Sequence, residues 1–125
     1  MTTERFTGSQ TDSALSDVDL SGKQYHAVKR TPTGVTLCGA GDHCDGVINE
    51  GKAQGLHTSF KTGNQVKAVA GAAIAIGAKV TPNAAGKFVT ATAGSEVFGT
   101  ARSAAAAADD LVSIYVDRSN ADLAA

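Results

Sequence analysis

Large apolar side chains are scarce in this 125-residue chain. Tryptophan is absent, aromatic residues make up 5% of the sequence, and 23 residues are alanine. The length is that of one ordinary domain. We therefore expect a core with few bulky side chains, and contacts with a partner or with further copies would supply burial that a single copy lacks.

An excess of either charge is also missing, because 11 basic and 12 acidic residues give a formal net charge of -1. Binding to nucleic acid through its phosphates needs clustered lysine and arginine, so we expect no nucleic-acid partner. No apolar run is long enough to span a bilayer, and the first residues lack the pattern of a secretory signal. We therefore expect no membrane partner and synthesis in the cytoplasm.

Cysteine is limited to Cys38 and Cys44, with His43 beside the second. Zinc sites normally show paired ligand spacings and four ligands, which this segment lacks. We interpret both cysteines as small packing residues and expect no metal, no cofactor and no catalytic residue. The alternative is a small β-barrel metal-binding or enzymatic domain that uses Cys38, His43 and Cys44. A disulfide between the two cysteines would form only in an oxidising environment.

Short alternating segments, each ended by Gly, Pro or Asn, fill most of the sequence. This pattern is typical of small β-barrels and β-sandwiches. We interpret residues 71–82 as a tight turn between strands and residues 103–108 as at most one short helical turn, capped by Ser103. The predicted fold is all-β, a small compact barrel or sandwich of β-tulip-like form. Strands are expected near residues 24–29, 35–38, 46–48, 57–61, 65–70, 87–91, 96–101 and 111–116.

Residues 1–20 are polar and contain more acidic than basic residues. We interpret them as an extended N-terminal arm, residues 21–117 as the β domain and residues 118–125 as a flexible C-terminal tail. A frayed terminus is the other interpretation of the first segment. The apolar side chains that could anchor the arm on a partner are Phe6, Leu15, Val18 and Leu20.

The sequence weakly matches itself at a shift of 53 residues. The identical pairs are Ala40 with Ala93, Gly41 with Gly94 and Gly46 with Gly99. Cys44 falls on Val97 at the same shift, which agrees with an apolar role for this cysteine. These matches indicate a duplicated strand–turn–strand unit.

Strand segments punctuated by glycine and alanine form an ordered series along the chain. They are residues 25–29, 34–37 and 45–48 in the first half and residues 69–81, 85–89, 97–101 and 105–114 in the second. Over residues 23–117 this series resembles the small capsid cement, or decoration, proteins of tailed bacteriophages. The resemblance implies a non-enzymatic structural protein on the outer capsid surface of the virion, made in the host cytoplasm. It also implies that the chain binds the major capsid protein, as a homotrimer, and stabilises the capsid lattice.

Two other classes stay open at this point. One is the metal-binding or enzymatic barrel described above, and the other is a carrier or adaptor module of a cellular complex. Metal analysis of the purified protein would separate a cement protein from the first class. Co-sedimentation with capsids would separate it from the second.

Overall fold

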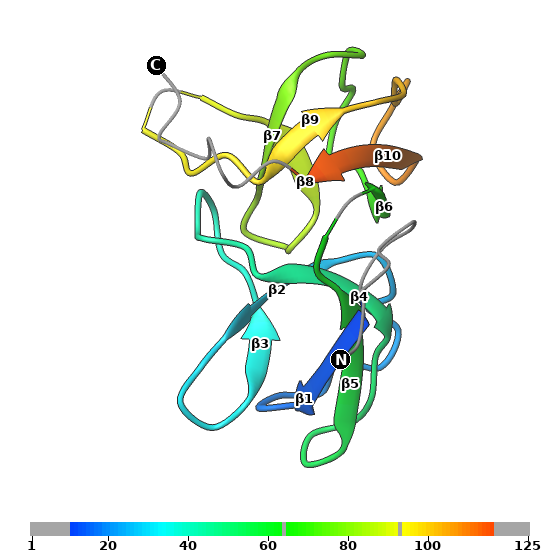
Figure 1. The fold of residues 1–125 in the computed structure, drawn as a ribbon. Coiled ribbons are helices and arrows are strands. Elements are labelled where there is room, and N and C mark those ends of the chain that lie inside the picture. The colour runs from blue at the N-terminus through cyan, green and yellow to red at the C-terminus, as the bar shows by residue number, and fades with distance from the viewer. Residues whose placement is uncertain (1–10, 64, 93, 117–125) are drawn as a thin grey trace, which may run out of the picture.

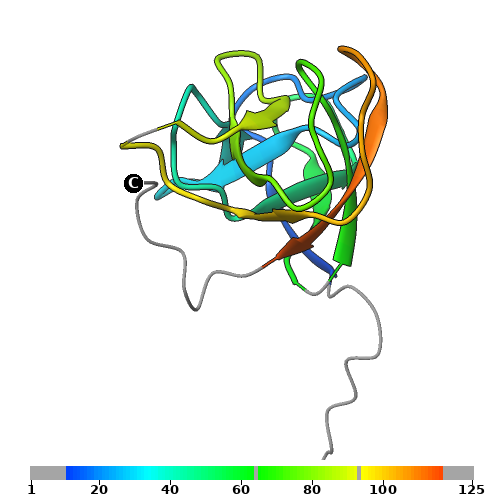
Figure 2. The ribbon, with the colours of Figure 1, turned by 90° about the horizontal axis from the view of Figure 1, so that it is seen from above.

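The computed structural model describes residues 11–63, 65–92 and 94–116, which contain strands and turns but no helix. The strands form two five-stranded antiparallel sheets that stack as a sandwich (Figures 1 and 2). The predicted all-β fold is therefore confirmed. The strands are β1 (Thr11–Leu15), β2 (Ala27–Arg30), β3 (Val35–Leu37), β4 (Gly46–Glu50), β5 (His57–Lys61), β6 (Gln65–Val69), β7 (Lys79–Pro82), β8 (Phe88–Thr90), β9 (Gly99–Ala101) and β10 (Leu111–Val116).

The two sheets have the same topology. The strand order is β1-β5-β4-β2-β3 in one and β6-β10-β9-β7-β8 in the other, so each strand of the first half has its counterpart five strands later. Each sheet also curls until its edge strands meet at one parallel bridge, Ser16 with Val35 in the first and Ala70 with Phe88 in the second. We call residues 11–61 the first repeat and residues 65–116 the second repeat. The duplicated unit is thus the whole five-stranded sheet.

Backbone hydrogen bonds outside the strands repeat as well. The Ser16 amide donates to the Leu56 carbonyl at 2.9 Å, and the corresponding Ala70 amide donates to the Asp110 carbonyl at 2.8 Å. These bonds continue the pairing of β1 with β5 and of β6 with β10. Where the edge strands of each sheet meet, the Asp17 amide donates to the Val35 carbonyl at 2.9 Å, and the corresponding Gly71 amide donates to the Phe88 carbonyl at 2.7 Å. The repeat is therefore preserved in the backbone although few side chains are identical.

Two clusters of buried side chains hold the sandwich together. The smaller one lies within the first repeat and contains Leu20, Val28, Val35, Ile48 and Phe60. The larger one fills the second repeat, where the rings of Phe88 and Phe98 lie 5.2 Å apart. This larger core extends into the first repeat through Ala27, Cys38, Cys44 and Val47, so it also joins the two sheets.

The described half of the expected arm is part of the first sheet. Strand β1 pairs with β5 along its whole length, from Thr11 opposite Lys61 to Leu15 opposite His57. Leu20, which follows, is fully buried. The interpretation of residues 11–20 as an extended arm is therefore wrong. Polar residues can form an edge strand because the pairing rests on backbone hydrogen bonds, and outward side chains need not be apolar.

The second half differs from expectation in two segments. Residues 71–82 were expected to be a turn, but their end is strand β7, which pairs with both β8 and β9. Residues 103–108 form no helical turn, and the Ser103 hydroxyl accepts a hydrogen bond from the Ser113 amide at 3.0 Å. Ala105 forms a bridge with Ile74 across the sheet end. Ala105 is held in this bridge and the run ends in a turn before Asp110, because tertiary pairing outweighs the helical propensity of alanine.

Candidate functional site

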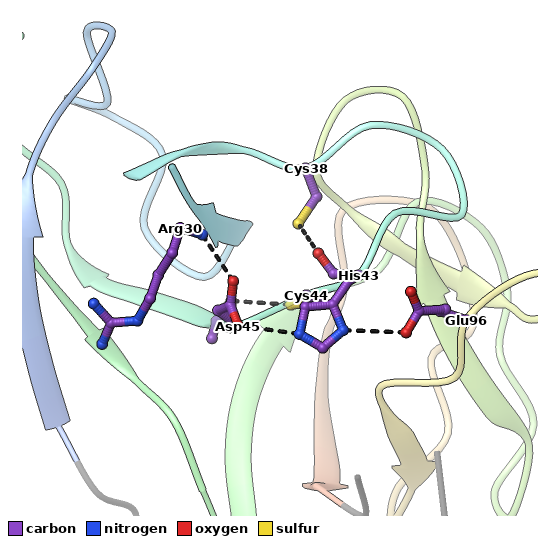
Figure 3. Close-up of polar contacts among 7 residues, drawn as sticks. Arg30, Cys38, His43, Cys44, Asp45 and Glu96 are labelled. Atoms are coloured by element: carbon purple, nitrogen blue, oxygen red, sulfur yellow. Dashed lines mark hydrogen bonds and ion pairs between the residues drawn. The ribbon is translucent and has the colours of Figure 1, made fainter. Parts of the chain in front are cut away.

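Cys38 and Cys44 point into the protein at the junction of the two repeats. Their exposed fractions are 2% and 4%, and both are free cysteines. The Cys38 thiol donates to the carbonyl of His43 at 3.5 Å, and the Cys44 thiol donates to the carbonyl of Gly46 at 3.1 Å (Figure 3). Buried thiols with backbone acceptors are packing residues of low reactivity.

The imidazole of His43 lies outside this core and joins the two repeats. Its Nε2 is 3.1 Å from Oδ1 of Asp45, and its Nδ1 is 3.1 Å from Oε1 of Glu96 in the second repeat (Figure 3). The hydrogen bond with Glu96, with further help from the charge of Asp45, raises the pKa of His43. Asp45 is itself positioned, because its Oδ2 accepts a hydrogen bond from the Arg30 amide at 2.7 Å. Protonated His43 is therefore a link between the repeats.

The geometry does not bring Cys38, His43 and Cys44 together as one site. The two thiols are directed to backbone carbonyls, whereas both ring nitrogens of His43 are directed to carboxylates. A Cys/His nucleophile would need the thiol in hydrogen-bond reach of the ring. Within residues 11–63, 65–92 and 94–116, no three His, Cys, Asp or Glu side chains are grouped as metal ligands.

The four apolar contact candidates differ in accessibility. Leu15 and Val18 are each 42% exposed, whereas Leu20 is fully buried in the core of the first repeat. Phe6 lies outside the described residues. Sequence reasoning missed Leu56, which is 55% exposed and whose carbonyl accepts the hydrogen bond from the Ser16 amide, beside Leu15. Only long-range pairing of β1 with β5 brings Leu56 close, so no local pattern could have indicated it.

A cavity of about 280 Å³ lies between the repeats, where the chain passes from β5 to β6. Its lining includes the lysines Lys61 and Lys67 and no carboxylate, which makes it a basic feature of the surface. The residues that line it are Tyr25, Ile48, Asn49, Lys61, Gln65, Val66 and Lys67.

In the described ranges no helix is long and apolar enough to cross a membrane.

Fold and site together define a small all-β protein of the structural or binding class. Its described residues form no assembled catalytic group. The sequence model of the phage cement protein family matches residues 21–117. The chain belongs to this family, and it is accordingly a structural, non-enzymatic protein associated with the phage head.

One solved structure shares the fold over nearly the whole chain. It is the head fiber gp8.5 N base in bacteriophage phi29, with a TM-score of 0.69 and 19% sequence identity. The match covers 93% of this chain and 98% of that one. A search of the curated proteins found no match.

Proposed function

We propose that this chain is a capsid cement protein that binds the outside of the phage head and stabilises the lattice of the major capsid protein. The observation that carries the proposal is the family match over residues 21–117, which covers nine of the ten strands. The fold of a phage head fiber base in the phi29 structure supports it, since a β domain of this kind is suited to a position on a head.

The two stacked repeats suit the chain to a clamping role. Both sheets have their edge strands joined by a bridge, and a shared core connects them, so the domain is one packed body. A rigid body loses little conformational freedom when it binds. Many copies on one shell add their modest individual affinities, because each further contact on the same lattice forms at high effective concentration.

Leu15 and Val18 stay candidate capsid contacts in this proposal, now together with Leu56. Fully burying a leucine or valine side chain contributes about 1.5–3 kcal/mol. These three side chains are already about half buried, so a partner would gain roughly half of that from each. The gain is enough for a weak contact that becomes firm when repeated over the shell. Leu20 contributes to stability of the first repeat instead.

We further propose that the chain acts as a homotrimer. In a single copy Ile76 and Leu111 stay 68% and 47% exposed, so further copies would have apolar surface to cover. Sedimentation equilibrium of the purified protein, at concentrations that span the micromolar range, tests the trimer. A monomer throughout that range, together with isolated single copies on the capsid, would contradict it.

The test of the main proposal is co-sedimentation with phage heads that lack the protein. We expect the chain to pellet with expanded, DNA-filled heads and not with compact proheads, and its addition to raise the temperature at which heads release DNA. Serum albumin serves as the control for trapping in the pellet. If the chain stays in the supernatant with both kinds of head, or binds without changing the release temperature, the proposed stabilising role is wrong.

A further inference from the structure

The outward face of the second sheet carries three cations around an aromatic ring. Lys67 on β6, Arg102 just after β9 and Lys79 on β7 are exposed, and Tyr115 on β10 is 45% exposed. We call these four residues the basic face.

Strand register places the four residues on one side of the sheet. Lys67 lies opposite Ser113, whose carbonyl accepts a hydrogen bond from the Arg102 amide at 2.7 Å. Tyr115 lies opposite Thr100, and Thr100 lies opposite Lys79. The Arg102 guanidinium is 5.8 Å from the centre of the Tyr115 ring, a cation–π distance that holds both groups at the surface.

The cations of the basic face have no carboxylate partner among the described residues. Ion pairs in that part of the chain involve Lys29, Arg30, Lys52 and Lys87, together with His43, and Lys23 and Lys61 also form none. The basic face is therefore a local positive surface on a chain whose net charge is -1. Its charge is available to an external partner, and Arg and Tyr are among the residues enriched at protein interfaces.

Comparison of the two repeats indicates that this side of the sheet can be covered by another protein surface. In the first repeat the corresponding positions are Ala27 for Lys79 and Val47 for Thr100, and both are buried under the second repeat. The Ala27 amide donates to the Gly86 carbonyl there at 2.7 Å. The second repeat leaves the same side of its sheet open (Figure 1). Alanine at this position suits an apolar partner surface, whereas lysine suits an acidic one.

We propose that the basic face is the surface that docks on the capsid, and that its occupant is an acidic patch of the major capsid protein. This inference rests on the proposed function and adds to it the side of the domain that meets the shell. Complementary charge would orient the domain during association and hold its register on the lattice. Tyr115, stacked under Arg102, would supply the apolar part of the contact.

The test compares two charge reversals of equal size in the co-sedimentation assay with heads that lack the protein. Lys79→Glu with Arg102→Glu alters the basic face, whereas Lys23→Glu with Lys52→Glu alters cations of the first repeat outside it. Thermal melts confirm that both variants fold. We expect the first pair to weaken binding by at least about tenfold and the second by less than about twofold. Tyr115→Ala, which removes a half-exposed ring, should weaken binding without a loss of folding, and added salt should weaken binding of the unaltered chain.

The outcomes distinguish a wrong docking surface from a wrong proposed function. If the unaltered chain binds heads and the Lys79/Arg102 variant binds equally well, the basic face is not the docking surface, and the proposed function stands. If this variant instead dissociates the homotrimer, the face holds a second copy and the inference is overturned. If the unaltered chain binds no heads at any salt concentration, the proposed function and this inference fail together.

Discussion

Gly46 and Gly99 occupy the same position in the two repeats, and each lets its strand approach the carbonyl of a neighbouring strand. A Cβ at Gly46 would lie 2.6 Å from the Lys61 carbonyl oxygen, and one at Gly99 would lie 2.2 Å from that of Tyr115. Lys61 and Tyr115 are themselves corresponding residues of β5 and β10. The same close contact between strands is therefore built twice, and in both cases only glycine fits.

Alanine at either glycine should destabilise the domain. Overpacking of this kind typically costs about 1–3 kcal/mol, and here the obstacle is backbone that cannot rotate away. Chemical denaturation of Gly46→Ala and Gly99→Ala measures the loss. Gly77→Ala is the control, since a Cβ there meets nothing within 4 Å and only the positive φ of 87° opposes it. A loss no larger than that of the control would show that the close approach is relieved cheaply.

Asp109 should tolerate glycine better than valine. It has a φ of 73° and corresponds to Gly55, whose φ is 87°, at the turn before the last strand of each repeat. A β-branched residue in this region is strained by about 1–2 kcal/mol, whereas glycine is not. We expect Asp109→Gly to melt close to the unaltered protein and Asp109→Val clearly below it. Asp109→Asn is the control for loss of the ion pair with Lys87, because asparagine also adopts positive φ. Equal melting of the glycine and valine variants would contradict the prediction.

Leu20 should matter for folding and Leu15 for contacts. Truncating a buried leucine to alanine costs about 2–5 kcal/mol, and Leu20 is completely buried. Leu15→Ala, at a side chain with 42% exposure, should cost much less. Urea unfolding of the two variants distinguishes the residues, and capsid co-sedimentation of Leu15→Ala then tests its proposed contact. If Leu20→Ala were as stable as Leu15→Ala, the first core would not depend on this residue.

The stability of the protein should fall as pH rises through the pKa of His43. Its pKa is raised in the folded protein, mainly by the hydrogen bond with Glu96. The stabilisation is therefore complete below the unfolded histidine pKa of about 6.5 and is lost as pH increases through the folded value. The effect should be small, because the side chain is 53% exposed and solvent screens the pair. Melting temperature measured from pH 5.5 to pH 8.5 follows it.

The matched controls for this pH dependence are two glutamine variants. His43→Gln should remove the downward step at high pH. His26 has the opposite shift, since burial lowers its pKa, so it costs stability as pH falls below about 6.5. His26→Gln should therefore leave the step from His43 in place. If the step survives in His43→Gln, another group carries it.

Replacing both cysteines should leave capsid binding nearly intact. Cys44 corresponds to Val97, and both cysteine side chains pack in the shared core. We expect Cys38→Ala with Cys44→Val to lower stability by about 1–2 kcal/mol through imperfect packing. Co-sedimentation and elemental analysis check the prediction together. Stoichiometric zinc in the unaltered protein, or loss of its fold on chelation, would restore the metal-site hypothesis.

Local sequence patterns were sufficient to predict the all-β fold and most strand positions. Alternation around residues 57–61 and 111–116, each followed or preceded by turn residues, marks strands that the structure has as β5 and β10. Strand β1 was missed because its sequence, TDSAL, lacks apolar alternation and depends on β5 for its pairing. Strand β7 was missed because Pro82 is normally a turn signal. Pro82 is the last residue of β7, where its missing N–H removes no hydrogen bond from the ladder.

The candidate site was less accessible to sequence reasoning than the fold. Burial of Leu20 and exposure of Leu56 both follow from pairing between segments about 40 residues apart, which local composition does not report. The link from His43 to Glu96 spans 53 residues for the same reason. His43 and Glu96 are corresponding positions at the shift of 53 residues, but equivalence within a repeat does not by itself indicate contact.

The contact of Ala27 with Gly86 gives the stack of two repeats a direction. The first repeat contacts the second through the side of its sheet that carries Ala27. The second repeat uses a different side for this contact, so the arrangement has no twofold symmetry. A free repeat that packed on its own copies in this manner would grow into an open-ended fibre. Lys79 stands at the position where a further Ala27 would admit the next unit. A charged lysine at that position disfavours the same apolar packing by a further unit.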